Sequence, residues 1–364
     1  MKFGFIKNWY ARYERLISSL SLLGGFVFDI FALKRIDLFW DNLWVAMHLL
    51  VAAIGIILIN LFENRKHLLV EKIAGRIHFW LIILIQFAFG GLLSTFLVFY
   101  FRSGTFSASW PFLLLLALVF AFNEILKTHY TRLAFQTIVL YISIYSFAIF
   151  ILPVILHQMG DGIFLLSGAV SLVLLWLFLL ALRYISRERF VKSRKALIFH
   201  IVLITTLVNI LYFTNLIPPI PLSLKDAGVY HSLYRNSDGN YTATEEPQTF
   251  WDFFKSYKLF HEVAGQPVYV FTSIFAPTNL NVQVIHDWQH YDETSRKWQS
   301  IEKMSLSIIG GRDGGFRTYS IMTVSQSGLW RVDVTTLKGQ LIGRVKFQVE
   351  NATNTPALET NILD

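Results

Sequence analysis

The sequence contains no cysteine among its 364 residues. Disulfide bonds, thiolate metal sites and cysteine nucleophiles are therefore excluded, and an exported domain must be held together by its own hydrophobic core. Charged residues are also scarce, at 15% of the chain against about a quarter in an ordinary globular protein, while hydrophobic residues reach 54%. This balance excludes an ordinary soluble protein.

Charge is distributed unevenly along the chain. Residues 1–217 hold 19 Lys and Arg against 9 Asp and Glu, whereas residues 218–364 hold 13 against 15. A sequence pI near 9.5 would usually raise a nucleic-acid hypothesis. Here the basic residues lie between long apolar runs, where they act as signals of membrane topology, so we predict no nucleic-acid partner.

Apolar runs long enough to cross a bilayer, about 20 residues each, recur through residues 1–217. Because strands or irregular backbone would leave polar groups unpaired in lipid, the runs are expected to be helices. The chain is therefore predicted to begin with an all-α membrane bundle of about seven transmembrane helices. The predicted spans are 16–33, 42–62, 77–101, 107–126, 133–156, 162–182 and 196–217.

Lys and Arg in the connecting segments predict the orientation. Sixteen of them lie before the first span and after spans two, four and six, against three in the alternate loops. Since basic loops remain in the cytoplasm, the N-terminus is predicted to be cytoplasmic and the C-terminal domain to be outside.

Residues 218–265 are predicted to be a linker that contains one amphipathic helix over 250–263. Aromatic residues recur there at helical spacing with lysines between them, namely Phe250, Phe253, Phe254, Tyr257 and Phe260. Such a helix suits the lipid headgroup layer, and equally suits docking onto protein, so both alternatives stay open.

From residue 266 the hydrophobic period changes to two, which is typical of strands. Six short strands predict a small all-β antiparallel sandwich over 266–350, of immunoglobulin-like size, followed by a tail over 351–364. Trp288, Trp298 and Trp330 are expected in its core. The predicted strands are 267–275, 281–291, 296–306, 316–324, 328–336 and 340–349.

Several segments resemble a bacterial family called domain of unknown function 2914. In the β region they are His286-Asp-Trp-Gln-His-Tyr291, Gly310-Gly-Arg-Asp-Gly-Gly-Phe-Arg-Thr-Tyr-Ser320, Gly328-Leu-Trp-Arg-Val-Asp333 and Gly343-Arg-Val-Lys-Phe347. Gly24-Gly-Phe-Val-Phe-Asp29 and Phe101-Arg-Ser-Gly-Thr-Phe-Ser-Ala-Ser-Trp110 look like the multi-span region of long members. The resemblance implies a bacterial inner-membrane protein with a periplasmic domain, and it supplies no catalytic residue.

Candidate ligand-binding residues lie in the β region. His286, Trp288 and His290 alternate and so share one strand face, which would suit a sugar or peptide unless it is ordinary sheet surface or core. Arg312 lies in a glycine-rich loop that could bind an anion, although a hairpin loop is the favoured interpretation. Arg317 and Tyr319 share a face of the next strand, and cross-strand ion pairs explain the charged residues there.

Acidic and basic residues inside or beside the spans are the other candidates, because charge in a membrane is costly. Asp29 lies near the outer end of the first span, close to Arg35, Asp37 and Asp41. A salt-bridge network explains this group, with an ion or proton site as the alternative. Glu124 lies near the cytoplasmic end of the fourth span.

No catalytic, metal-binding or cofactor motif is present, so we predict no cofactor and favour a protein that is not an enzyme. The leading hypothesis is a membrane platform whose periplasmic β domain binds an envelope protein or glycan. The alternatives are a transporter or channel that uses Asp29, and a membrane enzyme that acts on a lipid-linked substrate.

Overall fold

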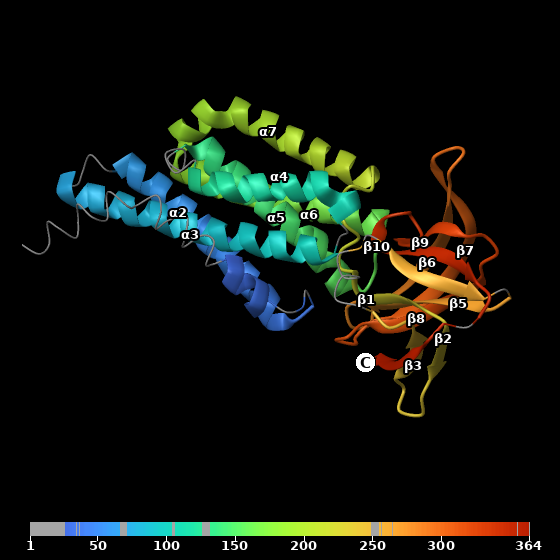
Figure 1. The fold of residues 1–364 in the computed structure, drawn as a ribbon. Helices are drawn as coiled ribbons and strands as arrows, with labels where there is room; N and C mark the ends of the chain where they lie inside the picture. The colour runs from blue at the N-terminus through green and yellow to red at the C-terminus, as the bar shows by residue number, and fades with distance from the viewer. Residues whose placement is uncertain are drawn as a thin grey trace, which may run out of the picture. The chain divides into compact units, whose positions relative to one another are not determined.

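The computed structural model describes the chain except for residues 1–25, 34, 36, 66–70, 104–105, 126–131, 249–254, 256, 264, 355 and 364. The chain divides into a helical unit and a β unit, and the β unit takes in residues 102–109 and everything from Asn215 onward (Figure 1). Each unit is described by itself below.

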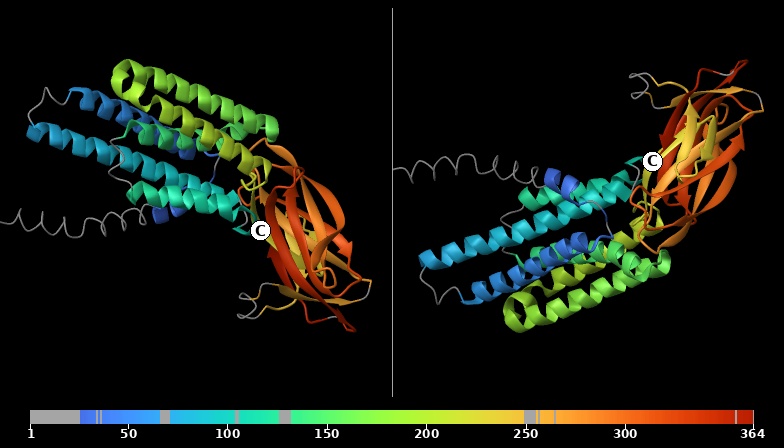
Figure 2. Two further views of the ribbon diagram at one scale, coloured as in Figure 1. Left: turned by 90° about the horizontal axis from the view of Figure 1, so that it is seen from above. Right: turned by 90° about the horizontal axis from the view of Figure 1, so that it is seen from below.

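Long helices make up the first unit and run side by side (Figure 2). Residues 26–32 are helical and belong to the first predicted span, whose residues 16–25 lie outside the described part of the chain. The helices that follow are α2 (Phe39–Arg65), α3 (Glu71–Ser103), α4 (Phe106–Ile125), α5 (Leu133–Leu156), α6 (Asp161–Ile185) and α7 (Arg187–Phe213).

Five of these helices, α2, α3, α5, α6 and α7, are long and apolar enough to cross a bilayer, and they embed the protein in a membrane. The prediction of seven spans is therefore confirmed for five within the described residues. The helix predicted over 107–126 is present as α4. Its described apolar part is Ser109–Phe120.

Buried polar side chains join helices within this unit. Asn60 of α2 donates to the Gln136 side chain of α5 across 2.8 Å, and both residues are fully buried. Tyr141 of α5 and Thr205 of α7 lie 2.6 Å apart, and Tyr212 of α7 donates to Asp161 of α6 across 3.1 Å. These bonds satisfy polar groups that lipid would leave unpaired.

Eleven strands make up the described part of the β unit. All six predicted strands are found within one residue of their expected starts, as β5 (Pro267–Phe275), β6 (Asn281–Asp292), β7 (Lys297–Ile309), β8 (Phe316–Thr323), β9 (Gly328–Thr336) and β10 (Leu341–Ala352). The others are β1 (Ser223–Tyr230), β2 (Ser232–Arg235), β3 (Tyr241–Glu245), β4 (Lys258–Val263) and β11 (Glu359–Leu363).

These strands form three sheets, with orders β1-β5-β8, β4-β10-β9-β6-β7 and β11-β3-β2. The first two sheets face a shared core that contains Val229, Val270, Trp288, Trp330 and Phe347. The third sheet packs on a smaller cluster around Phe271. The strands β5 to β10, which lie in or extend just past the predicted range 266–350, pair with one another in antiparallel fashion, as expected. Strand β4, from the segment predicted as a linker, adds to β10 in parallel.

The predicted helix over 250–263 is wrong where the structure describes it, since Lys258–Val263 is strand β4. Residues 250–254 of that prediction lie outside the described part. In β4 the buried positions alternate, at Phe260 and Glu262, and the backbone pairs with β10. Phe260 is therefore buried on one face of a sheet and not on the apolar face of a helix.

The segments predicted as linker and tail also contain strands. The polar strands β2 and β3 form a hairpin, and Gly239 in its turn has φ +83°. Strand β11, which is far away in the sequence, pairs with the other edge of β3. These strands were not predicted because their polar residues lack a clear alternation. β3 pairs with neighbouring β2 and with distant β11, and β1 pairs with distant β5.

The loop over residues 310–315 is not the hairpin that we expected, because β7 and β8 belong to different sheets. The loop crosses the β unit and packs closely on the chain before β6. A Cβ atom at Gly310 would lie 1.8 Å from the Pro277 carbonyl oxygen and 2.9 Å from that of Leu280. Gly314, in the same loop, has no atom within 4 Å of such a Cβ.

Gly310→Ala should therefore destabilise the β unit by about 1–3 kcal/mol, because two backbone segments must move apart. Gly314→Ala is the matched control and should change stability by less than about 0.5 kcal/mol. Hydrogen–deuterium exchange of β5 and β6 amides in the full-length protein measures both. Equal protection in the two variants would show that the loop does not pack as described.

Candidate functional site

A continuous chain of polar contacts crosses the outer face of the five-stranded sheet, the face turned away from the shared core. It begins at Ser300 of β7, which donates to Asp287 of β6 at 2.5 Å, and Asp287 also accepts from Gln289 at 2.5 Å. Gln289 in turn accepts from Arg331 of β9 at 2.8 Å. The contacts therefore link three neighbouring strands.

The chain continues from β9 to β10 through an ion pair. Both carboxylate oxygens of Asp333 accept from Arg344, with Nη2 at 2.7 Å, and the two residues lie directly opposite in the strand register. Arg331 lies 3.7 Å from the same carboxylate. The side chains of Asp333 and Arg344 are only 10% and 19% exposed, so the pair is largely desolvated. We call these six residues, Ser300, Asp287, Gln289, Arg331, Asp333 and Arg344, the polar ladder.

Aromatic rings flank the polar ladder on both sides. The Arg331 guanidinium lies over the Trp298 ring at 4.4 Å, and Tyr291 packs against Trp298 at 5.2 Å. At the other side, the Lys346 ammonium lies 5.5 Å from the Tyr257 ring. Partial burial lowers the pKa of Arg331 from its usual value, although the Asp333 carboxylate favours the charged form.

The predicted binding face of His286 and Trp288 lies on the opposite side of β6, inside the core. Both residues are fully buried. His286 Nδ1 lies 2.8 Å from Ser320 Oγ, and Nε2 lies 3.1 Å from Thr272 Oγ1. Trp288 donates to the same Ser320 oxygen at 2.9 Å. Burial lowers the pKa of His286 to about 4, so the ring is neutral and ties β6 to β5 and β8.

The other predicted residues of the β region do not converge on one site. His290 Nε2 lies 3.1 Å from the Ser327 carbonyl, and its ring packs on Trp330. Arg312 is exposed in the crossing loop. Arg317 donates to Asn240 at 2.8 Å, and Tyr319 packs beside Tyr241 of the third sheet.

Some of the charged residues near the first span form the ion pairs that the sequence predicted. Arg35 makes two hydrogen bonds to Asp37, at 2.9 and 2.6 Å, and the Arg35 backbone N–H donates to Asp41 at 3.2 Å. Asp29 is buried, with 8% of its surface exposed. Glu124 lies in α4, and its side chain is outside the described part.

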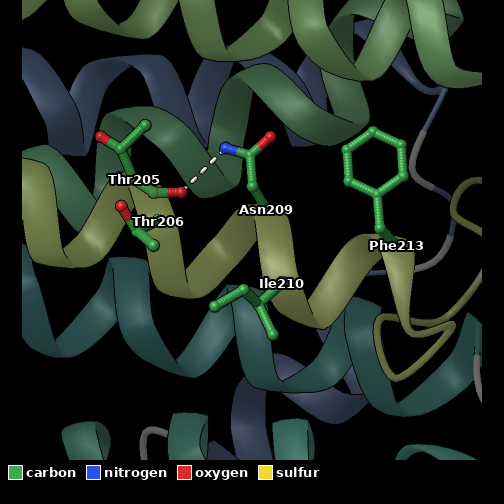
Figure 3. A pocket seen from close by; sticks show the side chains of 5 residues that line it. All are labelled: Thr205, Thr206, Asn209, Ile210 and Phe213. Carbon is green, nitrogen blue, oxygen red and sulfur yellow. Dashed lines mark hydrogen bonds between the residues drawn. The ribbon is translucent and has the colours of Figure 1, made fainter.

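A hollow on α7 is lined by Thr205, Thr206, Asn209, Ile210 and Phe213, as Figure 3 shows. Asn209 donates to the Thr205 carbonyl at 2.8 Å and to the Tyr145 hydroxyl at 3.2 Å. No lining side chain titrates near neutral pH. The hollow therefore offers no acid–base chemistry.

Within the described residues, no three His, Cys, Asp or Glu side chains are grouped so that they could hold a metal ion. The sequence did not predict the polar ladder, because the histidines at 286 and 290 favoured the opposite face of the same strand as the binding face. Asp287, Gln289 and Tyr291 alternate in the same segment, and this second set of polar and aromatic residues indicates the other face of the strand. Trp298, predicted as a core residue, lies on this outer face, because a bulge in β6–β7 pairing shifts its register.

A comparison with protein families finds a match within the β unit. The family model described as "Protein of unknown function (DUF2914)" matches residues 281–349, from β6 into β10. That match contains every residue of the polar ladder, together with Tyr291 and Trp298. No curated protein matches the chain.

A solved structure of the Pseudomonas fluorescens alkylpurine DNA glycosylase AlkC, bound to DNA containing an abasic site analog, is similar at 9% identity and a TM-score of 0.21. The alignment covers 85% of this chain and 98% of that chain. A TM-score this low carries no argument about fold or function. The chain is thus a membrane-embedded protein that carries a DUF2914 domain at residues 281–349.

Proposed function

We propose that this protein is a non-enzymatic platform in the bacterial inner membrane, and that the polar ladder of its β unit binds an envelope glycan in the periplasm. The observation that carries the proposal is the polar ladder itself, a set of oriented donors and acceptors across four strands with aromatic rings at both sides.

The orientation rests on the basic residues. Lys and Arg concentrate in the segments assigned to the cytoplasm, and the segments on the other side hold only Lys34, Arg35 and Arg102. Because the positive-inside rule counts short loops near the span ends, this distribution supports a periplasmic β unit.

A glycan suits this face better than a protein does. Sugars present hydroxyl groups at their rims and apolar C–H groups on their ring faces, which match alternating polar groups and aromatic rings. Protein interfaces have cores depleted of charge, whereas the centre of this face holds Arg331, Asp333 and Arg344. The ladder residues are already oriented by one another, so a ligand meets groups whose rotamers are fixed.

The test is binding of soluble peptidoglycan fragments to the full-length protein in lipid nanodiscs. Trp298→Ala should weaken binding at least tenfold, because it removes the ring that supports Arg331 and contacts the ligand; tenfold corresponds to about 1.4 kcal/mol. Tyr234→Ala is the control, since Tyr234 is 56% exposed on β2 in the third sheet, and it should bind as the wild type does.

Three outcomes would reject the proposal. The wild type could bind no glycan, or the Trp298 and Tyr234 variants could bind equally. A photo-crosslinker at Ser300 that captured only a protein would assign the face to a protein partner instead.

A further inference from the structure

The turn between α6 and α7 concentrates positive charge. Residues 183–195 contain six Lys and Arg against one carboxylate, that of Glu188. Helices α6 and α7 are joined by a single residue, Ser186, so these charges gather at one end of both helices. Arg189 is half-buried, and the other five basic side chains are exposed. We call these five the basic corner, namely Arg183, Arg187, Lys192, Arg194 and Lys195.

Hydrogen bonds fix the backbone of this turn. Ser186 is fully buried, and its backbone N–H donates to the Leu182 carbonyl at 2.8 Å. The Asn64 side chain, at the end of α2, donates to the Ile185 carbonyl at 2.9 Å and accepts from the Ser186 hydroxyl at 3.2 Å. The turn is therefore tied to a third helix, and the basic side chains project from a backbone that is held in place.

The basic corner is short of counter-charge. Within the described part of the chain, none of its five side chains makes a hydrogen bond, an ion pair or a ring contact. Glu63, at the same end of α2, lies 3.2 Å from His78 of α3, and its side chain is only 17% exposed. Glu188 is exposed, and it is one carboxylate against five positive charges. An anion from outside the chain is therefore the partner that the charge of this corner favours.

Apolar side chains continue one face of α7 away from the turn. Val191, Ile198 and Val202 are 62%, 52% and 58% exposed. They alternate with or follow Arg187 and Arg194 at spacings of three and four residues, so all five share one helix face. A free phosphate would meet only the basic end of this face. A phospholipid meets both parts, because its phosphate and its acyl chains are covalently joined.

The length of α7 places the basic corner in the lipid headgroup layer. Its 27 residues extend about 40 Å, which matches a bilayer with both headgroup layers included. The first turns of the helix therefore reach beyond the hydrocarbon core, and long basic side chains extend into the same layer. Tyr184, in the last turn of α6, is 92% exposed, and tyrosine is enriched at this interface.

We propose that the basic corner binds the headgroups of anionic phospholipids, with their acyl chains along the exposed apolar face of α7. Arg187 and Arg194 supply planar guanidinium groups, which bind a phosphate through two parallel hydrogen bonds, and the two lysines add charge beside them. Each basic side chain near a membrane surface strengthens the attraction to anionic lipids. The surface lies in the helical unit and does not depend on glycan binding by the β unit.

The experiment measures which lipids lie beside the basic corner of the full-length protein in nanodiscs. Because the chain has no cysteine, Val191→Cys gives a single attachment point for a fluorescent label. The quencher is a nitroxide on the acyl chain, close to the headgroup, of either phosphatidylglycerol or phosphatidylcholine at the same mole fraction. The quenching constant of the anionic lipid should be about fivefold larger at about 0.05 M salt. This ratio should shrink at about 0.5 M salt, because ions screen the attraction.

Three variants of the labelled protein assign the preference to the basic corner. Arg187→Gln with Arg194→Gln and Lys195→Gln should bring the ratio of the two quenching constants close to one. Arg187→Lys with Arg194→Lys keeps the charge and should retain most of the preference. Glu188→Gln removes the carboxylate and should increase the preference. Quenching by phosphatidylcholine should be the same in every variant, because its headgroup has no net charge.

Ile155→Cys provides the control position for the label. Ile155 is 62% exposed and lies in the last turn of α5, near the start of α6 and so at the end of α6 opposite to the basic corner. Phosphatidylglycerol should quench this label no more strongly than phosphatidylcholine does. The proposal is overturned if both labels show the same ratio, or if the triple variant keeps the wild-type ratio. Loss of the preference on addition of inorganic phosphate at constant ionic strength would assign the corner to free phosphate and overturn the proposal as well.

Discussion

Acidification from pH 6.5 to about 4 should lower the free energy of unfolding of the β unit by about 3 kcal/mol through one residue, His286. The folded state holds this ring neutral because it is fully buried between Thr272 and Ser320. In the unfolded chain the ring is solvated and takes up a proton near its ordinary pKa of 6.5.

The sign follows from where the proton binds. Above pH 6.5 both states are neutral at His286, and the residue contributes no pH dependence. Between 6.5 and about 4 only the unfolded state is protonated, so stability falls by about 1.4 kcal/mol for each pH unit. Below about pH 4 both states bind the proton, and this contribution stops changing.

Hydrogen–deuterium exchange of core amides in β6, corrected for the intrinsic exchange rate, measures this dependence in the full-length protein. His286→Gln cannot titrate and should flatten the profile between pH 6.5 and 4, whatever its absolute stability. His290→Gln, two residues along the same strand, should keep the wild-type slope. The hypothesis fails if the slope survives in His286→Gln.

Removal of the Asp333 carboxylate should be the most damaging single change on the outer sheet face, at about 3–5 kcal/mol for Asp333→Ala. Arg344 would lose both hydrogen bonds while it remains largely buried, and Arg331 would be left beside it as a second positive charge. Asp287 lies opposite Asp333 on β6, so the native face holds two neighbouring carboxylates, and Ser300 and Gln289 donate to that of Asp287.

A paired substitution separates loss of the ion pair from loss of packing. Asp333→Leu together with Arg344→Met should recover most of the stability, because it removes both charges and keeps similar volume. Glu350→Gln, at an exposed position of β10, should change stability by less than about 0.5 kcal/mol. Unfolding by denaturant measures the free energy of unfolding of the full-length wild type, of Asp333→Ala, of the double variant and of Glu350→Gln. An Asp333→Ala loss as small as that of Glu350→Gln would show that the pair is solvated.

Strongly periodic elements could be predicted from the sequence because their signal is local. An apolar run of span length can satisfy its backbone in lipid only as a helix, and α5 spans Leu133–Leu156 as the range 133–156 predicts. Likewise, β5 and β9 match 267–275 and 328–336, since alternation and turn residues are written within the segment itself.

Prediction failed where a distant partner decides the conformation. Lys258–Val263 ends the segment predicted as a helix and is nevertheless a strand, because β10 offers it a parallel edge almost ninety residues later along the chain. The prediction of the binding face was wrong for a related reason. A strand's alternation separates two faces but does not say which one meets the core, and that choice placed His286 inside and Asp287 outside.

The sequence by itself determined that this protein is embedded in a membrane and ends in a β unit, because hydrophobic runs and periodicity act over a few residues. Only the tertiary structure decided which side chains meet. Asp333 faces Arg344, and Asn60 donates to Gln136, through pairings of elements far apart along the chain. Such contacts depend on register and burial, which no local pattern encodes.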